Sequence, residues 1–104
     1  MARKLPAHDA SATPLVRSLS DLGKIVRNQR ALGQLRIDDA AALSFVSSDL
    51  LSRLENGKPV TLDKLLRVLD GLGLRMVVVP TKDLQPIENL LNQQTATAGD
   101  ASHE

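Results

Sequence analysis

Apolar residues between positions 20 and 70 recur at helical spacing, in runs that turn residues separate. The first predicted helix has Ser20 as its N-cap and ends at Gly33, a residue that commonly closes helices. A short second helix is predicted from Ile37, because two acidic residues in its first turn favour the helix dipole and three alanines follow. The pattern therefore predicts short helices with short connections.

Two further helices follow the same pattern. Either Ser47 or Ser48 is predicted to cap the third helix, which ends at residues 55–57 and which Pro59 keeps from continuing. Thr61 is predicted to cap the fourth helix. The buried stripes are predicted to consist of leucines, namely Leu50, Leu51 and Leu54 in the third helix and Leu62, Leu65, Leu66 and Leu69 in the fourth.

The apolar run at residues 74–79 differs from the helices, because it contains three consecutive valines that favour a strand. A single strand cannot satisfy its own backbone groups, and the sequence shows no second strand. We therefore expect it to pair with the same strand of a second copy, which makes the protein a homodimer. The alternative is an extension of the fourth helix, which the valines disfavour. The expected dimer contacts are Leu74, Met76, Val77, Val78 and Val79.

The two ends of the chain differ in charge. Residues 1–18 mix Pro, Ala, Ser and Thr without periodicity, and they are expected to form a flexible basic arm. Residues 81–104 hold one basic and four acidic residues; beyond one or two amphipathic turns they are expected to form an acidic, disordered tail. The folded domain is therefore expected to span residues 19–80, which include the strand.

Composition narrows the fold class and the location. The chain has one Phe and neither Trp nor Tyr, so its core must be aliphatic, which suits packed helices better than a sandwich or barrel. It has no cysteine, which excludes disulfides and thiolate metal sites and fits a reducing cytoplasm. We find no signal peptide and no apolar run that could span a bilayer, and we expect a soluble cytoplasmic protein that does not contact membranes.

The sequence offers little for catalysis. Both histidines, His8 and His103, lie in the expected flexible ends. Asp38 and Asp39 are adjacent, so on a helix their side chains would diverge by about 100°. A role at a helix start explains both acids. The glycines form no phosphate-binding loop. We therefore expect no enzyme activity, no cofactor and no metal site.

One predicted surface has the form that DNA recognition requires. Four polar residues share the outward face of the third helix, namely Ser48, Asp49, Ser52 and Arg53. A helix in the major groove reads base edges with such side chains, since arginine binds guanine and aspartate accepts a hydrogen bond from cytosine. The alternative is an ordinary solvated helix face, on which Asp49 only favours the helix dipole.

The residues of this helix resemble a known family. The run VSSDLLSRLENG at residues 46–57 is similar to the third-helix pattern V-S-x-x-x-I-S-x-I-E-N-G of the Cro/repressor-type (XRE) helix-turn-helix family, and the resemblance covers residues 22–74. It implies a mainly α fold, a compact lambda-repressor-like bundle of four to five helices that contains a helix-turn-helix. It also implies binding to double-stranded DNA at palindromic operators, which would associate the protein with the nucleoid.

The resemblance assigns roles to individual residues. The positions that contact bases or phosphates in the family are occupied here by Ser47, Ser48, Asp49, Arg53, Asn56 and Lys58. Arg30 matches a first-helix arginine that pairs with Glu55. Two positions depart from the family. Ile37 stands where many members have a DNA-contacting Gln, so that contact is missing or passes to Arg36. Phe45 stands where the turn usually has Gly, so either the turn is reshaped or Phe45 accepts strain.

The fourth helix with its following strand resembles the HipB-type antitoxins of this family. This resemblance implies a transcriptional repressor that regulates its own operon and that, as the antitoxin of a toxin–antitoxin system, binds a HipA-like kinase toxin. Two alternatives remain open at this point. One is a stand-alone XRE-family regulator without a toxin partner. The other is a protein-interaction module that acts through the acidic tail.

Overall fold

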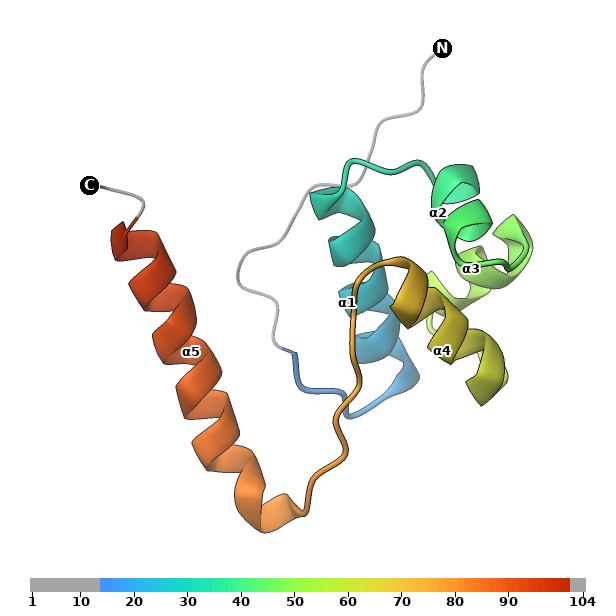
Figure 1. Cartoon of the computed structure of the whole chain (residues 1–104). Coiled ribbons are helices and arrows are strands. Elements are labelled where there is room, and N and C mark those ends of the chain that lie inside the picture. Colours follow the sequence, from blue (N-terminus) through green and yellow to red (C-terminus); the bar gives the residue numbers. More distant parts are fainter. Residues whose placement is uncertain (1–13, 102–104) are drawn as a thin grey trace.

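A computed structural model describes residues 14–101, with the backbone alone for residues 94–101 (Figure 1). This part of the chain is mainly helical, as predicted, and contains no strand. Its helices are α1 (Leu19–Leu32), α2 (Ile37–Leu43), α3 (Ser48–Glu55), α4 (Leu62–Gly71) and α5 (Leu84–Ala101), and a 3₁₀ turn, η1 (Thr81–Asp83), precedes α5. Helices α1 to α4 form a compact bundle, whereas α5 stands apart from them (Figure 1).

The start of α1 lies two residues earlier than predicted. Ser18 is the N-cap, since its Oγ accepts a hydrogen bond from the Asp21 N–H (3.2 Å). Asp21 Oδ2 in turn accepts from the Arg17 N–H (3.0 Å). The prediction of Ser20 was wrong: Ser18 is followed three positions later by Asp21, whose carboxylate also binds the backbone just before the cap, whereas Ser20 is followed at that spacing by Gly23.

Thr61 stands at the start of α4, as predicted, but its side chain does not bond the backbone there. The Thr61 hydroxyl instead hydrogen-bonds the Asp63 carboxylate, which lowers the pKa of Asp63 below its usual range. Asp63 lies in the first turn of α4, where an ionised carboxylate favours the helix dipole. Thr61 is therefore the N-cap by position, and its side chain caps no backbone group of α4.

The first four helices end in the same way. In each, the second N–H after the C-cap bonds the carbonyl five residues earlier, as in Val46 N–H to Ala41 O (3.1 Å). This closure, a Schellman motif, places the residue after the cap in the left-handed region. Those residues are Gln34 (φ 55°), Phe45 (φ 56°), Gly57 (φ 76°) and Gly73 (φ 75°). The turn at Phe45 is therefore not reshaped, and Phe45 holds a strained backbone that glycine adopts easily.

The core is aliphatic, as predicted, and all four bundle helices contribute to it or to its edge. The buried cluster consists of Val26, Ala40, Ala41, Leu51, Leu54, Leu65, Val68, Leu69 and Leu72. The predicted stripe of α4 needs correction, because Leu62 and Leu66 are 60% and 47% exposed whereas Val68 is fully buried. A helix at the surface of a bundle buries only the face that its neighbours cover. In α4 that face holds Leu65, Val68 and Leu69.

Two glycines allow close approach between helices, which the hydrophobic pattern did not indicate. A Cβ on Gly23 of α1 would lie 2.5 Å from Leu54 O of α3. A Cβ on Gly71 of α4 would lie 2.5 Å from the Oγ of Ser44, the buried C-cap of α2. Ser44 Oγ donates to Ala40 O (2.8 Å), so this buried hydroxyl is satisfied. The absence of a side chain at both glycines therefore sets how closely α1 packs on α3 and α4 on α2.

The segment after α4 differs in part from the sequence predictions. Helix α4 ends at Gly71, so the alternative that residues 74–80 extend it is wrong. In the single chain these residues are neither helix nor strand, and their pairing with a second copy stays a prediction. The acidic tail was expected to be disordered after one or two turns, but residues 84–101 form one helix. Leu, Gln and Ala favour helix, and Pro86 lies in the first turn, where no intrahelical N–H bond is lost.

Candidate nucleic-acid interface

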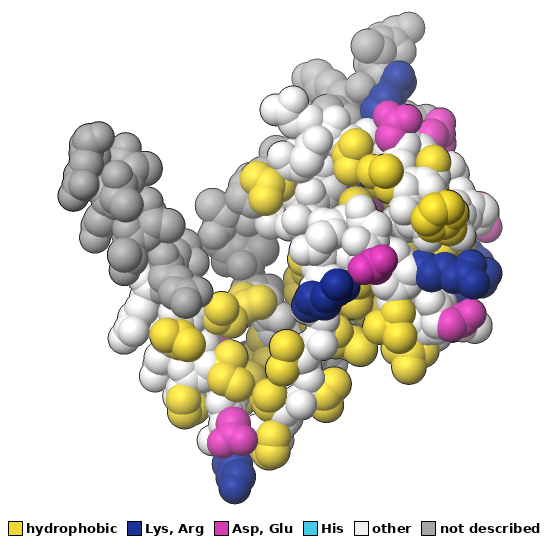
Figure 2. Space-filling model, viewed as in Figure 1, with side chains coloured by type: hydrophobic (Ala, Val, Ile, Leu, Met, Phe, Trp, Pro, Cys, Tyr) yellow, Lys and Arg dark blue, Asp and Glu magenta, His cyan; other side chains and the backbone are white. Residues whose placement is uncertain are grey.

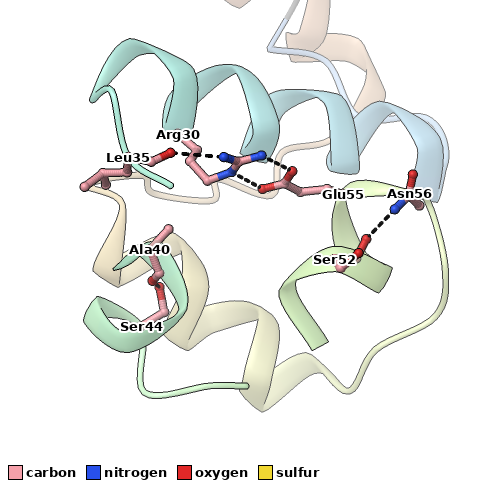
Figure 3. A network of polar contacts seen from close by, with 7 residues as sticks. All are labelled: Arg30, Leu35, Ala40, Ser44, Ser52, Glu55 and Asn56. Atoms are coloured by element: carbon pink, nitrogen blue, oxygen red, sulfur yellow. Dashed lines mark hydrogen bonds and ion pairs between the residues drawn. The ribbon is translucent and has the colours of Figure 1, made fainter. Parts of the chain in front are cut away.

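Helix α3 is anchored to α1 by a buried ion pair (Figure 3). Arg30 Nε donates to Glu55 Oε2 (2.7 Å), and Arg30 Nη2 donates to Glu55 Oε1 (2.8 Å). Arg30 Nη1 donates to Leu35 O (3.0 Å), just before α2. The two side chains are only 9% and 6% exposed, so this bidentate pair is largely desolvated. The pair expected from the sequence is present, and it fixes the orientation of α3 on α1.

A second contact joins α3 to α2. Ser48 Oγ donates to Asp38 Oδ1 (2.8 Å), and both residues lie in the first turn of their helices. The sequence indicated Asp38 only as a favourable charge at a helix start. Nothing in the local pattern relates two residues ten positions apart, and only the turn at residues 44–47 brings them together. The angle between α2 and α3 is therefore supported by a polar contact as well as by packing.

The outward edge of α3 carries two exposed charged residues of the predicted set. Asp49 and Arg53 have side chains that are 86% and 52% exposed, and Arg53 Nε lies 3.5 Å from Asp49 Oδ2. Such an exposed pair one helical turn apart is weak and screened by water. It holds the Arg53 guanidinium at the surface without burying it. The donors of Arg53 are therefore accessible to a ligand.

The end of α3 combines a cap with an exposed cation. Asn56 Nδ2 donates to Ser52 O (2.8 Å), so the amide of Asn56 closes the helix (Figure 3). Gly57 follows with φ 76°, and a Cβ on it would lie 3.2 Å from Ser20 Cα. The left-handed backbone and this close passage against the start of α1 both favour glycine at this position. Lys58 is exposed directly after it.

The remaining predicted residues take several positions. Of the two residues predicted to cap α3, Ser47 is the N-cap, because its Oγ accepts from the Leu50 N–H (3.1 Å). Arg36 is exposed at the N-cap position of α2. Ile37 packs against the core, so a surface contact by this residue is lost. The structure thus brings together along one short helix the predicted residues Ser47, Ser48, Asp49, Ser52 and Arg53, followed by Asn56 and Lys58.

The charge around this helix is mixed. Exposed acids, Asp38 and Asp49, accompany the exposed cations Arg36, Arg53 and Lys58. Figure 2 shows mainly the side of α2 and α4, with α3 behind them, and there too Lys and Arg side chains lie next to Asp and Glu side chains. Phosphates would be attracted by the cations and repelled by the acids. Binding of nucleic acid here would therefore depend on specific contacts more than on net charge.

No protein-family model matches the chain, and no curated protein sequence is significantly similar to it. None of the helices in the described part is long and apolar enough to cross a membrane. Within the same residues, no three His, Cys, Asp or Glu side chains lie together in a way that could hold a metal ion.

Proposed function

We propose that the protein is a sequence-specific DNA-binding transcriptional repressor, in which α2 and α3 form a helix-turn-helix and α3 reads the major groove. The observation that carries this proposal is the exposed edge of Asp49 and Arg53 on a short helix. Two polar contacts support the orientation of that helix, one to α1 through Arg30 and one to α2 through Ser48. The major groove admits one helix, and readout requires outward side chains in a defined orientation.

Recognition would begin with the exchange of one weak contact for a stronger one. Arg53 donates to O6 and N7 of a guanine, and Asp49 accepts from the amino group of a cytosine. The Asp49–Arg53 pair must open first, which costs at most about 1 kcal/mol for an exposed pair. A good bidentate base contact contributes about 1–3 kcal/mol of discrimination. The guanine contact therefore offsets the loss of the pair.

The other polar residues of this surface position α3 on the duplex. The N-terminus of α3 at Ser47 faces a phosphate, because helix N-termini attract anions. Arg36, Asn56 and Lys58 contact further phosphates, which fix the register of the protein without reading sequence. Ser52 lines the same face, and its hydroxyl contacts base edges or nearby phosphates. The Ser48 hydroxyl donates its proton to Asp38, so it contacts a base only by accepting from an amino group.

The repressor would act as a homodimer whose residues 74–79 pair between two copies. Two copies of α3 would then read the halves of a palindromic operator, about one helical turn of DNA apart. The exposure of Val77 and Val78, 74% and 86%, supports this, because a monomer leaves both side chains in water.

We further propose that this repressor is the antitoxin of a HipBA-like toxin–antitoxin system, which represses its own operon and binds a kinase toxin in the cytoplasm. The support is the succession of an α3 that resembles the XRE pattern, a fourth helix and an apolar extended segment. A stand-alone regulator would share these features. A kinase-like protein encoded by the adjacent reading frame would distinguish the antitoxin from that regulator.

The assignment of α3 is tested by Arg53→Ala. We expect this variant to lose about 1–3 kcal/mol of binding free energy at the operator and to relax base preference at one position. The operator is first located by footprinting on the promoter of the protein's own gene, and affinities are measured by gel shift. Arg27→Ala, which removes an exposed arginine from α1, is the control and should keep its base preference. Unchanged affinity and base preference in Arg53→Ala would refute readout by α3.

A further inference from the structure

Hydrophobic side chains gather on the segment after α4 and on the first turns of α5 (Figure 2). We call residues 74–93 the C-terminal arm. Its extended part exposes Met76, Val77 and Val78. In α5, residues 84, 87 and 91 are apolar and lie on one face, because they are spaced three and four apart. Burial of one large apolar side chain contributes about 1.5–3 kcal/mol. A monomer leaves most of this stabilisation unused at the exposed residues of the extended part, whereas residues 84 and 87 of α5 are already half-buried.

The backbone of the extended part is also without partners. Leu74 N–H bonds Leu69 O, and Pro80 O accepts from the Asp83 N–H. Between these two bonds, residues 75–79 make no backbone hydrogen bond. An extended segment with free donors and acceptors pairs readily with another strand. The described residues hold no second extended apolar segment, so the same segment of a second copy is the matching partner.

Antiparallel pairing centred on Val77 would determine where α5 begins relative to the partner's bundle. It places Pro80 beside Leu74 of the partner subunit, so α5 begins near the end of the partner's α4. Seven extended residues span roughly 23 Å, which moves α5 away from the end of its own α4. In each bundle the C-terminal end of α4 lies against α1, since Gln29 Nε2 of α1 donates to Leu72 O (3.0 Å). One turn further along α1, Leu32 is 57% exposed.

We propose that the C-terminal arm is exchanged between two copies, with the apolar face of α5 packed on the partner's bundle over Leu32. The inference rests on the homodimer of the proposed function and adds an exchanged helix to its paired strands. Charge favours this arrangement over contact between two α5 helices, because residues 81–104 hold one basic and four acidic residues whereas residues 20–80 hold nine basic and seven acidic. Most of the stability of a helix in a protein comes from packing of its apolar face, so α5 gains from such a cover.

The exchanged contact is tested on the full chain by sedimentation equilibrium. Ile87→Glu on the arm and Leu32→Lys on the receiving helix should each raise the dimer Kd by about a hundredfold or more, because a symmetric dimer loses two well-buried apolar contacts worth about tenfold each. Gln93→Glu adds the same charge on the opposite face of α5 and should leave the Kd within about twofold of the wild type. A wild-type Kd in Ile87→Glu or in Leu32→Lys would overturn the exchange.

A mixture of the two variants tests which molecule receives α5. The heterodimer of Ile87→Glu with Leu32→Lys has one native arm contact and one Glu–Lys contact, whereas each variant homodimer has two mismatched contacts. It should therefore form about tenfold more tightly than either homodimer. No preference for the heterodimer would overturn the exchange, since α5 would then contact its own bundle or another α5.

The same measurements separate this inference from the proposed function. A wild-type dimer that binds an operator, together with a wild-type Kd in Ile87→Glu, would overturn the exchanged helix and leave the repressor intact. A wild-type chain that remains monomeric at high concentration would overturn both the exchange and the dimeric repressor. Loss of operator binding in Arg53→Ala, with its dimer Kd unchanged, would support DNA readout without bearing on the arm.

Discussion

The four-helix bundle and the C-terminal arm use similar residues with opposite results. In the bundle, Val26, Leu51 and Val68 are fully buried. In the arm, Val77 and Val78 are largely exposed. Residue type does not explain the difference, since both regions are rich in aliphatic side chains. The helices of the bundle cover one another within one chain, and the arm has no comparable cover. Apolar character thus predicts that a side chain becomes buried, but it does not tell whether the same chain or a second molecule buries it.

Ion pairs show the same contrast between the two regions. The Arg30–Glu55 pair lies within the bundle and is nearly inaccessible to water. The Arg75–Asp70 pair joins the arm to the end of α4 at 2.9 Å, and its side chains are 81% and 73% exposed. Both pairs are short, but only the buried one would leave an uncompensated charge in the protein interior if a partner were removed.

The largest expected effect on stability is that of Glu55→Ala. It leaves the Arg30 guanidinium buried without its counter-charge, and we expect the free energy of unfolding to fall by about 3–5 kcal/mol. Arg75→Ala breaks a pair of similar length at the surface and should cost less than about 1 kcal/mol. Urea unfolding followed by circular dichroism measures both. If both variants lost the same free energy of unfolding, burial would not distinguish the ion pair of the bundle from that of the arm.

The second prediction compares two aliphatic truncations. Leu51→Ala opens a cavity in the core and should cost about 2–5 kcal/mol at any protein concentration. Val78→Ala should leave the unfolding free energy of the monomer unchanged and should weaken the dimer instead. Unfolding measured over a wide range of protein concentrations separates these effects. A concentration-independent loss of more than 1 kcal/mol in Val78→Ala would show that the arm packs on its own bundle.

The smallest effect is a gain in stability from Phe45→Gly. Phe45 has φ 56° and is 82% exposed, so the substitution relieves backbone strain and gives up little burial within the chain. We expect the bundle to gain about 1 kcal/mol, which raises Tm by about 4–8 °C in a domain of this size. Calorimetry at low concentration measures the gain. A loss of stability at low concentration would show that the Phe45 ring packs within its own chain by more than the strain costs.

The candidate site was predictable in composition but not in geometry. The sequence indicated the polar edge of α3 and the Arg30–Glu55 pair, since helical spacing places residues on a common face and a family resemblance suggested the pair. It did not indicate that Asp38 accepts from Ser48, nor that Gly23 lets α1 approach α3. Both contacts join residues of different helices, so no local periodicity reports them.

The sequence alone determined the number and approximate bounds of the bundle helices, because apolar spacing, capping residues and glycines act within a few positions of each other. It also determined that the core is aliphatic. Only the tertiary structure decided which leucines of α4 are buried, that Phe45 takes a left-handed backbone, and that α5 is a helix standing apart from the bundle. These features depend on which surfaces meet in space, and local propensity does not encode such contacts.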